Sequence, residues 1–183
     1  GAFRGVLAVD SSVVKVHDSL RCVWKGTRRN SARAALKVHA WVRVFTGELV
    51  KAKLTAEAYG DSRAFRIGHD ERGVLLLFDR GYASPSLWRR VDSVGGYFLS
   101  RIPKGWNQQI VRNNLRCRGR ARSLVGKTLQ TAFVGLHRPI VDVMVTFRCR
   151  IRGYAGAKSR KVDHDFRVIA VRHPETGEYA MYV

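Results

Sequence analysis

The segment Gly73–Tyr82, GVLLLFDRGY, constrains the fold of this chain more than any other part of it. Its apolar residues Val74–Phe78 run without interruption into Asp79. A run that short and continuous is typical of a strand buried on both faces of a sheet and covered by helices. Because ligands of open α/β sheets gather at the carboxyl ends of strands, Asp79 is a candidate site residue. The alternative is an acid that only caps the turn at Gly81.

A second stretch of the same design lies near the N-terminus. In Phe3–Asp10, FRGVLAVD, an apolar run again ends in a single acid, and a Ser-Ser pair leads from it to the β-branched run Val13–Val16. Two neighbouring strands that each deliver a carboxylate can place both acids on one divalent cation. Sites built only from oxygen ligands suit Mg²⁺ or Mn²⁺, and a pair of such ions assists in-line attack at a phosphodiester. Asp10 and Asp79 are therefore the candidate catalytic and metal-binding residues.

Four segments, in order along the chain, resemble the DDE-type transposases of bacterial insertion sequences: LAVDSSVVKVHD, ALKVHAWVRVFTGELV, LLLFDRGYASPSLW and GGYFLSR. The resemblance implies an α/β fold, with a ribonuclease H-like mixed sheet flanked by helices and a β-rich insertion subdomain. It also implies that Asp10 matches the first catalytic aspartate of the family. Asp79 matches the second, within the family's D-R-G-Y motif.

The third catalytic acid of that family is a glutamate in a Y-x-x-R-x-x-x-E-x-x-x-x-x-x-K helix, and no such motif occurs before Val183. The last residues, VIAVRHPETGEYAMYV, resemble the strand pair that precedes this helix in the family. The resemblance therefore implies a sequence truncated before the catalytic glutamate. We expect these residues alone to be inactive in DNA cleavage.

The resemblance also implies a function, namely part of a transposase catalytic core. The full enzyme would hydrolyse a phosphodiester at a transposon end and join the freed 3′-hydroxyl to target DNA. The implied cofactor is Mg²⁺ or Mn²⁺, and the implied partner is double-stranded DNA, with a homodimer as one candidate for the active complex. The expected location is the bacterial cytoplasm, beside the nucleoid. Two other interpretations remain open: a non-catalytic basic DNA-binding module, and a ribonuclease H-like nuclease.

Charge agrees with a nucleic-acid partner. The chain carries 34 Lys and Arg against 14 Asp and Glu, a net charge of +20, and a protein that basic is expected to bind polyanions. The arginines of the stretch RCRGRARSLVGK either contact DNA phosphates or belong to a solvated surface loop. The candidate phosphate-contacting residues are Lys37, Arg80, Arg101, Lys104, Arg116, Arg118, Arg120 and Arg122. No apolar run approaches the ~18 residues of a membrane span.

Two parts of the chain are predicted, a partial catalytic core over residues 1–105 and a β-rich insertion over residues 106–183. In the first part we expect a short helix at Tyr59–His69, in which Asp61 acts as N-cap rather than as a metal ligand. The other elements expected there are strands Phe3–Val9 and Val13–Val16 joined by a tight turn, a hairpin of Ala34–Phe45 with Leu49–Ala56, a helix Ser84–Ser93 and a strand Tyr97–Ser100.

In the second part, apolar residues alternate with arginines over Val143–Arg152, which predicts a strand with one apolar and one cationic face. Phe166–Val171 and Glu178–Val183 predict a hairpin around Pro174–Gly177. The three cysteines, Cys22, Cys117 and Cys149, share no paired spacing, which favours free thiols in a reducing compartment. A zinc site that combines Cys117 and Cys149 with histidines is the less favoured alternative.

Overall fold

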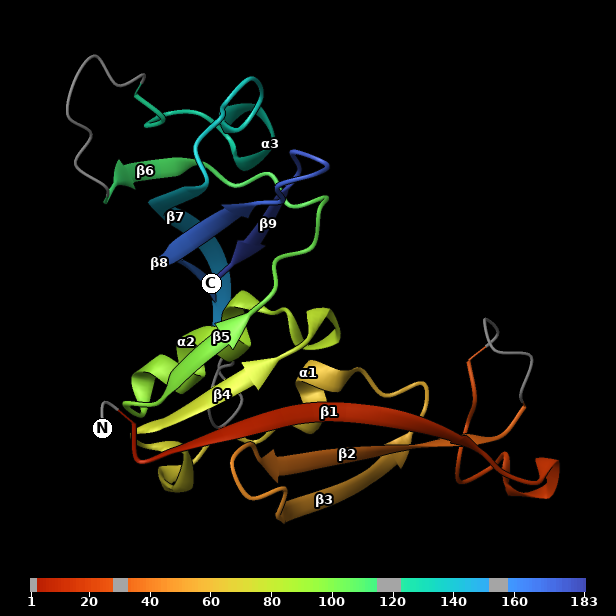
Figure 1. The fold of residues 1–183 in the computed structure, drawn as a ribbon. Helices are drawn as coiled ribbons and strands as arrows, with labels where there is room; N and C mark the ends of the chain where they lie inside the picture. The colour runs from red at the N-terminus through yellow and green to blue at the C-terminus, as the bar shows by residue number, and fades with distance from the viewer. Residues whose placement is uncertain (1–2, 28–32, 115–122, 152–157) are drawn as a thin grey trace. The chain divides into compact units, whose positions relative to one another are not determined.

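A computed structural model describes residues 3–27, 33–114, 123–151 and 158–183 of the chain. It shows a mixed α/β protein with two sheets (Figure 1). The chain divides into two compact units, one of residues 1–82 and 90–99, the other of residues 83–89 and 100–183. No helix among the described residues is long and apolar enough to cross a membrane.

The first unit is built on a five-stranded sheet whose strand order is β3-β2-β1-β4-β5 (Figure 1). β1 pairs antiparallel with β2 and parallel with β4, and β2 pairs antiparallel with β3. The predicted mixed sheet and the predicted β2–β3 hairpin are therefore confirmed. The strands are β1 (Gly5–Lys15), β2 (Ala35–Arg43), β3 (Leu49–Ala56), β4 (Val74–Phe78) and β5 (Tyr97–Ser100).

The tight turn predicted after Val9 is wrong, because β1 continues through the Ser-Ser pair to Lys15. Ser11 pairs with His39 of β2, and Ser12 pairs with Val38. The long partner strand satisfies the backbone groups of both serines, so pairing overrides their local preference for turns. As a result, Asp10 lies inside a strand instead of at its end.

Strand alternation gives this sheet one covered and one open face. Val9, Trp41 and Phe78 share the covered face through the register pairs Val9↔Trp41 and Val9↔Phe78, and each is at most 5% exposed. The ring of Phe65 packs on those of Trp41 and Phe78, with both centroid distances 5.3 Å. Asp10 has the opposite parity and is exposed, as is Leu54 on β3, which is 53% exposed.

The predicted helix Tyr59–His69 is much shorter in the structure. Only α1 (Asp61–Ala64) forms there, since Phe65 already adopts an extended backbone, and a separate 3₁₀ turn, η3, covers His69–Glu71. The N-cap of α1 is Gly60, so the prediction of Asp61 as N-cap is wrong. Its side chain is consequently free to serve other partners. Two further 3₁₀ turns are η1 (Asp18–Leu20) and η4 (Arg80–Tyr82).

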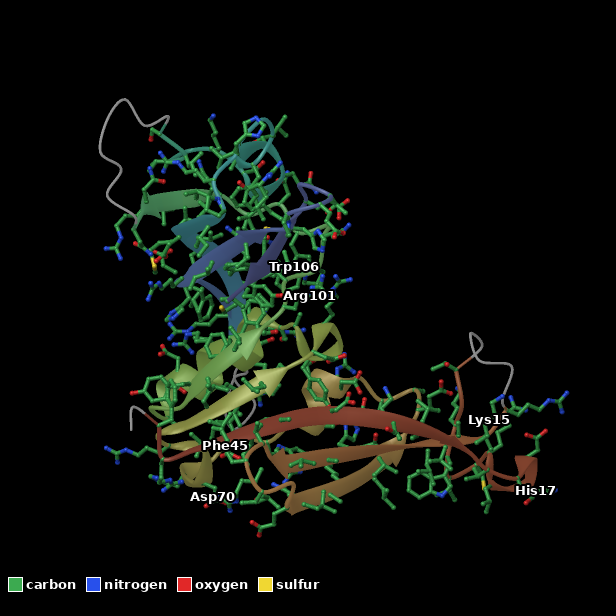
Figure 2. All side chains as sticks on the ribbon, in the orientation of Figure 1. Lys15, His17, Phe45, Asp70, Arg101 and Trp106 are labelled. Atoms are coloured by element: carbon green, nitrogen blue, oxygen red, sulfur yellow. The ribbon has the colours of Figure 1, made fainter. Side chains whose placement is uncertain are left out.

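The predicted helix after the D-R-G-Y motif is confirmed within one residue as α2 (Pro85–Ser93). A proline at the first helical position has no backbone N–H to leave unpaired, and its fixed φ suits a helix start. Trp88 of α2 is fully buried. Its ring packs against Phe147 and Phe166 of the second unit's sheet, with centroid distances of 5.5 and 5.7 Å. Trp106, labelled in Figure 2, joins the same aromatic core at 5.5 Å from Trp88.

The second unit contains a four-stranded antiparallel sheet in the order β6-β7-β8-β9. The predicted alternation is confirmed on β7, where Phe147 and Cys149 are buried and Arg148 and Arg150 are exposed. The predicted hairpin is confirmed as β8–β9, but β8 begins already at Arg160, since its first half carries mainly polar side chains that give no apolar signal. The elements are β6 (Ile110–Asn113), α3 (Leu129–Ala132), β7 (Ile140–Ile151), β8 (Arg160–Arg172) and β9 (Tyr179–Tyr182).

Candidate metal and nucleic-acid site

Asp10 and Asp79 come from neighbouring strands. β1 and β4 run parallel, and their last register pair is Val9↔Phe78. Each aspartate follows directly after its member of that pair, so both reach the same level of the sheet. This is the adjacency that the two acid-ended apolar runs predict. The catalytic and metal-binding roles of the two residues remain predictions.

Each of these carboxylates is held by backbone N–H groups. The N–H of Ser11 donates to Asp10 Oδ1 at 2.7 Å. The N–H groups of Gly81 and Tyr82 donate to Asp79 Oδ1 at 2.9 and 3.3 Å. Asp79 therefore does cap the turn after β4, but it uses one oxygen to do so. Within the described part of the chain, the second oxygen of each carboxylate accepts no hydrogen bond and can face a cation.

A third carboxylate, that of Asp61, reaches the same region. Its Oδ1 accepts hydrogen bonds from Lys37 Nζ at 2.9 Å and from Ser11 Oγ at 3.1 Å. Its Oδ2 lies 3.1 Å from the point where a Cβ on Gly81 would stand, and Asp79 Oδ1 lies 3.2 Å from that point. Sequence reasoning missed this placement, because no local pattern signals which distant strand a residue of a short helix will face.

Below this region lies a polar network on the covered face. The His39 side chain is fully buried, with Nδ1 2.9 Å from Tyr82 Oη and Nε2 2.9 Å from Thr55 Oγ1. Burial lowers the pKa of His39, which therefore stays neutral at neutral pH. Burial also raises the pKa of the Tyr82 hydroxyl, with the Asp61 and Asp79 charges acting in the same direction. Both groups accordingly act as neutral hydrogen-bonding partners, not as bases.

The predicted phosphate-contacting residues have different environments. Lys37 is 12% exposed and its ammonium is paired with Asp61, which places it inside the site rather than on an open surface. Arg80 and Arg101 are exposed. Four of the predicted arginines, Arg116, Arg118, Arg120 and Arg122, lie outside the described residues.

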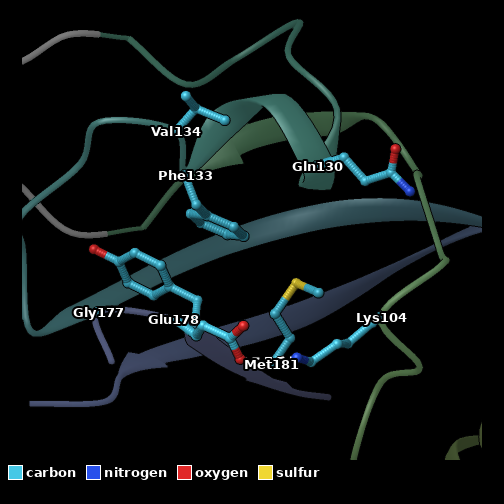
Figure 3. A pocket seen from close by; sticks show the side chains of 8 residues that line it. Lys104, Gln130, Phe133, Val134, Gly177, Glu178 and Met181 are labelled. Atoms are coloured by element: carbon cyan, nitrogen blue, oxygen red, sulfur yellow. Dashed lines mark hydrogen bonds and ion pairs between the residues drawn. The ribbon is translucent and has the colours of Figure 1, made fainter. Parts of the chain in front are cut away.

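Lys104 borders a pocket of about 470 Å³ in the second unit (Figure 3). The rings of Phe133 and Tyr179 stack beside it with a centroid distance of 4.9 Å. Lys104 Nζ binds Glu178 Oε2 at 2.7 Å, and the two side chains are 68% and 65% exposed. An ion pair that exposed is weak, and the role of Lys104 in contacting phosphates remains a prediction.

The donors around Asp10 and Asp79 are carboxylate oxygens, which suit a hard divalent cation such as Mg²⁺ or Mn²⁺. Within residues 3–27, 33–114, 123–151 and 158–183, no group of three or more His, Cys, Asp or Glu side chains is arranged to hold a metal ion. The two aspartates thus fit such a cation in the kind of atom that they offer. The zinc alternative gains no support, since the Cys149 thiol is buried and bonds to the carbonyl of Pro85, and Cys117 lies outside the described residues.

The sequence model of the family described as "Transposase DDE domain" matches residues 1–151. The chain belongs to this family. Membership confirms the resemblance to DDE-type transposases that was drawn from the sequence. The match includes both aspartate segments.

No curated protein matches the chain. Among solved structures, the chain is similar to a piggyBac transposase in a synaptic complex with hairpin DNA, with a TM-score of 0.44 and 10% identity. That match covers 100% of this chain and 32% of the other, so the chain spans about a third of that transposase. A likeness this distant carries no argument about the site.

Proposed function

We propose that this chain is part of the catalytic core of a metal-dependent DNA transposase, in which Asp10 and Asp79 hold Mg²⁺ or Mn²⁺. The observation that carries the proposal is the parallel register of β1 and β4, which brings these two aspartates to one level. A divalent cation bound there would neutralise charge on the attacking and leaving oxygens of a phosphodiester.

Backbone N–H groups orient these two carboxylates. One oxygen of Asp10 is held by the N–H of Ser11, and one oxygen of Asp79 by the N–H of Gly81. These bonds fix the orientation of each carboxylate, and a charged acceptor makes such bonds stronger than neutral ones. Both aspartates are exposed, so a DNA backbone can approach them.

The strand arrangement supports a ribonuclease H-like core. Three antiparallel strands, β3-β2-β1, are followed by β4 parallel to β1, which is the order expected from the family resemblance. We assign the core to residues 1–105 and the β-rich insertion to residues 106–183. The all-antiparallel sheet of β6–β9 supports that assignment.

The glutamate-helix motif of the family does not occur in these 183 residues. We infer that a carboxylate from outside them completes the ligand set, and that these residues alone do not cleave DNA. The open face of the sheet supports this inference, because it carries both Asp10 and exposed apolar residues such as Leu54. A segment that covers this face could bring a carboxylate to Asp10.

Double-stranded DNA is the proposed partner, with a homodimer as the proposed active complex in the bacterial cytoplasm. The net charge of +20 supports a polyanionic partner. Arg80, Arg101 and Lys104 are exposed and can meet phosphates. The sequence adds Arg116, Arg118, Arg120 and Arg122 as candidates. We expect the contacts to be mainly to phosphates, which set affinity rather than sequence preference.

Two measurements test the proposal. The affinity for a duplex should fall steeply with salt, by about 0.9 in log K per unit of log salt for each phosphate contact. A longer protein that includes the family's glutamate helix should nick a transposon-end duplex in Mg²⁺ or Mn²⁺, and Asp10→Asn or Asp79→Asn should abolish nicking while DNA binding persists. DNA binding with nicking that survives both substitutions would refute the assignment. DNA binding without any nicking would favour a non-catalytic DNA-binding module.

A further inference from the structure

We propose that Asp61 is a positioning residue that sets the geometry of Asp10 and Asp79 together. The inference rests on the proposed function, since it assumes that the two aspartates bind a divalent cation. Besides its pairing with Lys37, Asp61 accepts a hydrogen bond from Ser11 and lies against Gly81. Ser11 and Gly81 each hold one of the two carboxylates through a backbone N–H.

Ser11 connects Asp61 to Asp10 by two hydrogen bonds. The Ser11 hydroxyl donates to Asp61 Oδ1 at 3.1 Å, while the N–H of the same residue donates to Asp10 Oδ1 at 2.7 Å. Side chains alternate along a strand, so Ser11 faces the covered side and Asp10 the open side. Asp61 therefore fixes Ser11 from one side of the sheet, and Ser11 fixes Asp10 on the other.

Gly81 connects Asp61 to Asp79. Asp61 Oδ2 lies 3.1 Å from the position of a Cβ on that residue, so the carboxylate occupies the space that only a glycine leaves open. The N–H of Gly81 donates to Asp79 Oδ1 at 2.9 Å. The Asp61 carboxylate thus restricts the position of the Gly81 backbone, and through its N–H the position of the Asp79 carboxylate.

Lys37 holds Asp61 in this place. Its ammonium lies 2.9 Å from Asp61 Oδ1, and the two side chains are 12% and 19% exposed. A pair this well shielded from water is screened less than a surface pair. It also balances the negative charge that Asp61 adds near two further carboxylates. Because Asp61 acts from the covered face, it is suited to orient the ligands of a cation rather than to be one.

The test is Mn²⁺ binding by the 183-residue protein, measured from the electron paramagnetic resonance signal of free Mn²⁺. Asp61→Ala removes the contacts with both Ser11 and Gly81. It should weaken Mn²⁺ binding by about 10- to 100-fold, the usual effect of removing a group that orients metal ligands. Asp61→Asn keeps the shape and the Oδ1 acceptor and should restore most of the affinity. Glu48→Ala is the control, since it also removes an acid paired to a cation, Arg43, in the same unit.

The outcomes separate the inference from the proposed function. If Asp10→Asn and Asp79→Asn leave Mn²⁺ binding unchanged, the proposed metal site itself is wrong. If these two abolish binding but Asp61→Ala changes it by less than about twofold, Asp61 does not position the site. An Asp61→Asn variant as weak as Asp61→Ala would also overturn the inference, because the charge and not the placement would then matter.

A second variant protects the test against misfolding, which circular dichroism detects. Ser11→Ala keeps the N–H that holds Asp10 and removes only the hydroxyl that reaches Asp61. It should weaken Mn²⁺ binding several-fold with an unchanged unfolding midpoint. If Asp61→Ala does not fold and Ser11→Ala binds Mn²⁺ like the wild type, the inference fails.

Discussion

A methyl group at Gly81 would test how strongly cation binding depends on the placement of the carboxylates. A Cβ there would lie 3.1 Å from Asp61 Oδ2, and 3.2 and 3.5 Å from the two oxygens of Asp79. The two shorter distances are below ordinary van der Waals contact, so the carboxylates must shift by a few tenths of an ångström. Gly81 is not among the described glycines with positive φ, so alanine fits its backbone and any effect arises from these contacts.

The size of the effect follows from the bond that the shift disturbs. The N–H of Gly81 donates to Asp79 Oδ1 at 2.9 Å. A hydrogen bond to a charged group contributes about 1.5–3 kcal/mol. Because Asp79 is exposed, its bond lies at the low end of this range. The substitution weakens the bond only in part, so its cost is at most about 1.5 kcal/mol. Because 1.4 kcal/mol is about tenfold in an equilibrium constant, we expect Gly81→Ala to weaken Mn²⁺ binding by up to about tenfold.

The assay pairs a Mn²⁺ titration with urea unfolding followed by tryptophan fluorescence, to which Trp41 in the first unit contributes. Gly105→Ala is the matched control, since a Cβ at Gly105 meets nothing within 4 Å. We expect the control to match the wild type in both measurements. A folded Gly81→Ala protein that binds Mn²⁺ as tightly as the wild type would show that the carboxylates tolerate displacement, and the geometric reasoning would be wrong.

Three further predictions concern stability and reactivity. The hydrogen bond from Arg167 lowers the pKa of Asp142 in the folded protein. The stability that Asp142 contributes is therefore present above its unfolded pKa of about 4 and is lost as the pH falls further. In urea unfolding between about pH 2 and 6, Asp142→Asn should make the free energy of unfolding depend less on pH. Gly96→Ala should destabilise the protein by about 1–3 kcal/mol in the same assay, because its Cβ would lie 2.8 Å from a backbone oxygen; a change near zero would contradict the packing. Buried Cys149, whose thiol pKa is raised by burial, should resist iodoacetamide in the native protein while exposed Cys22 reacts, as peptide mass mapping would show.

Local patterns predicted those parts of the fold that depend on neighbours in the sequence. The apolar run ending at Asp79 became β4, and the turn at Gly47, with φ of 70°, joins the predicted hairpin. The alternation around Phe147 became β7. In each case the residues that determine the structure lie within a few positions of one another, so their pattern is visible in the chain. The likeness of two acid-ended runs was also enough to select Asp10 and Asp79.

Other features depended on partners far away in the sequence, and only the tertiary structure decided them. Ser11 stays in a strand because β2 pairs with it, although a Ser-Ser pair read locally favours a turn. Asp61 reads locally as a helix cap, yet its carboxylate reaches Ser11 and Lys37, residues 50 and 24 positions away. A side chain's local propensity is worth a fraction of a kcal/mol. A hydrogen bond to a charged group, worth about 1.5–3 kcal/mol, or a full set of strand hydrogen bonds outweighs it. The sequence by itself therefore determined which acids follow the apolar runs of neighbouring strands. Only the tertiary structure determined which groups hold those acids.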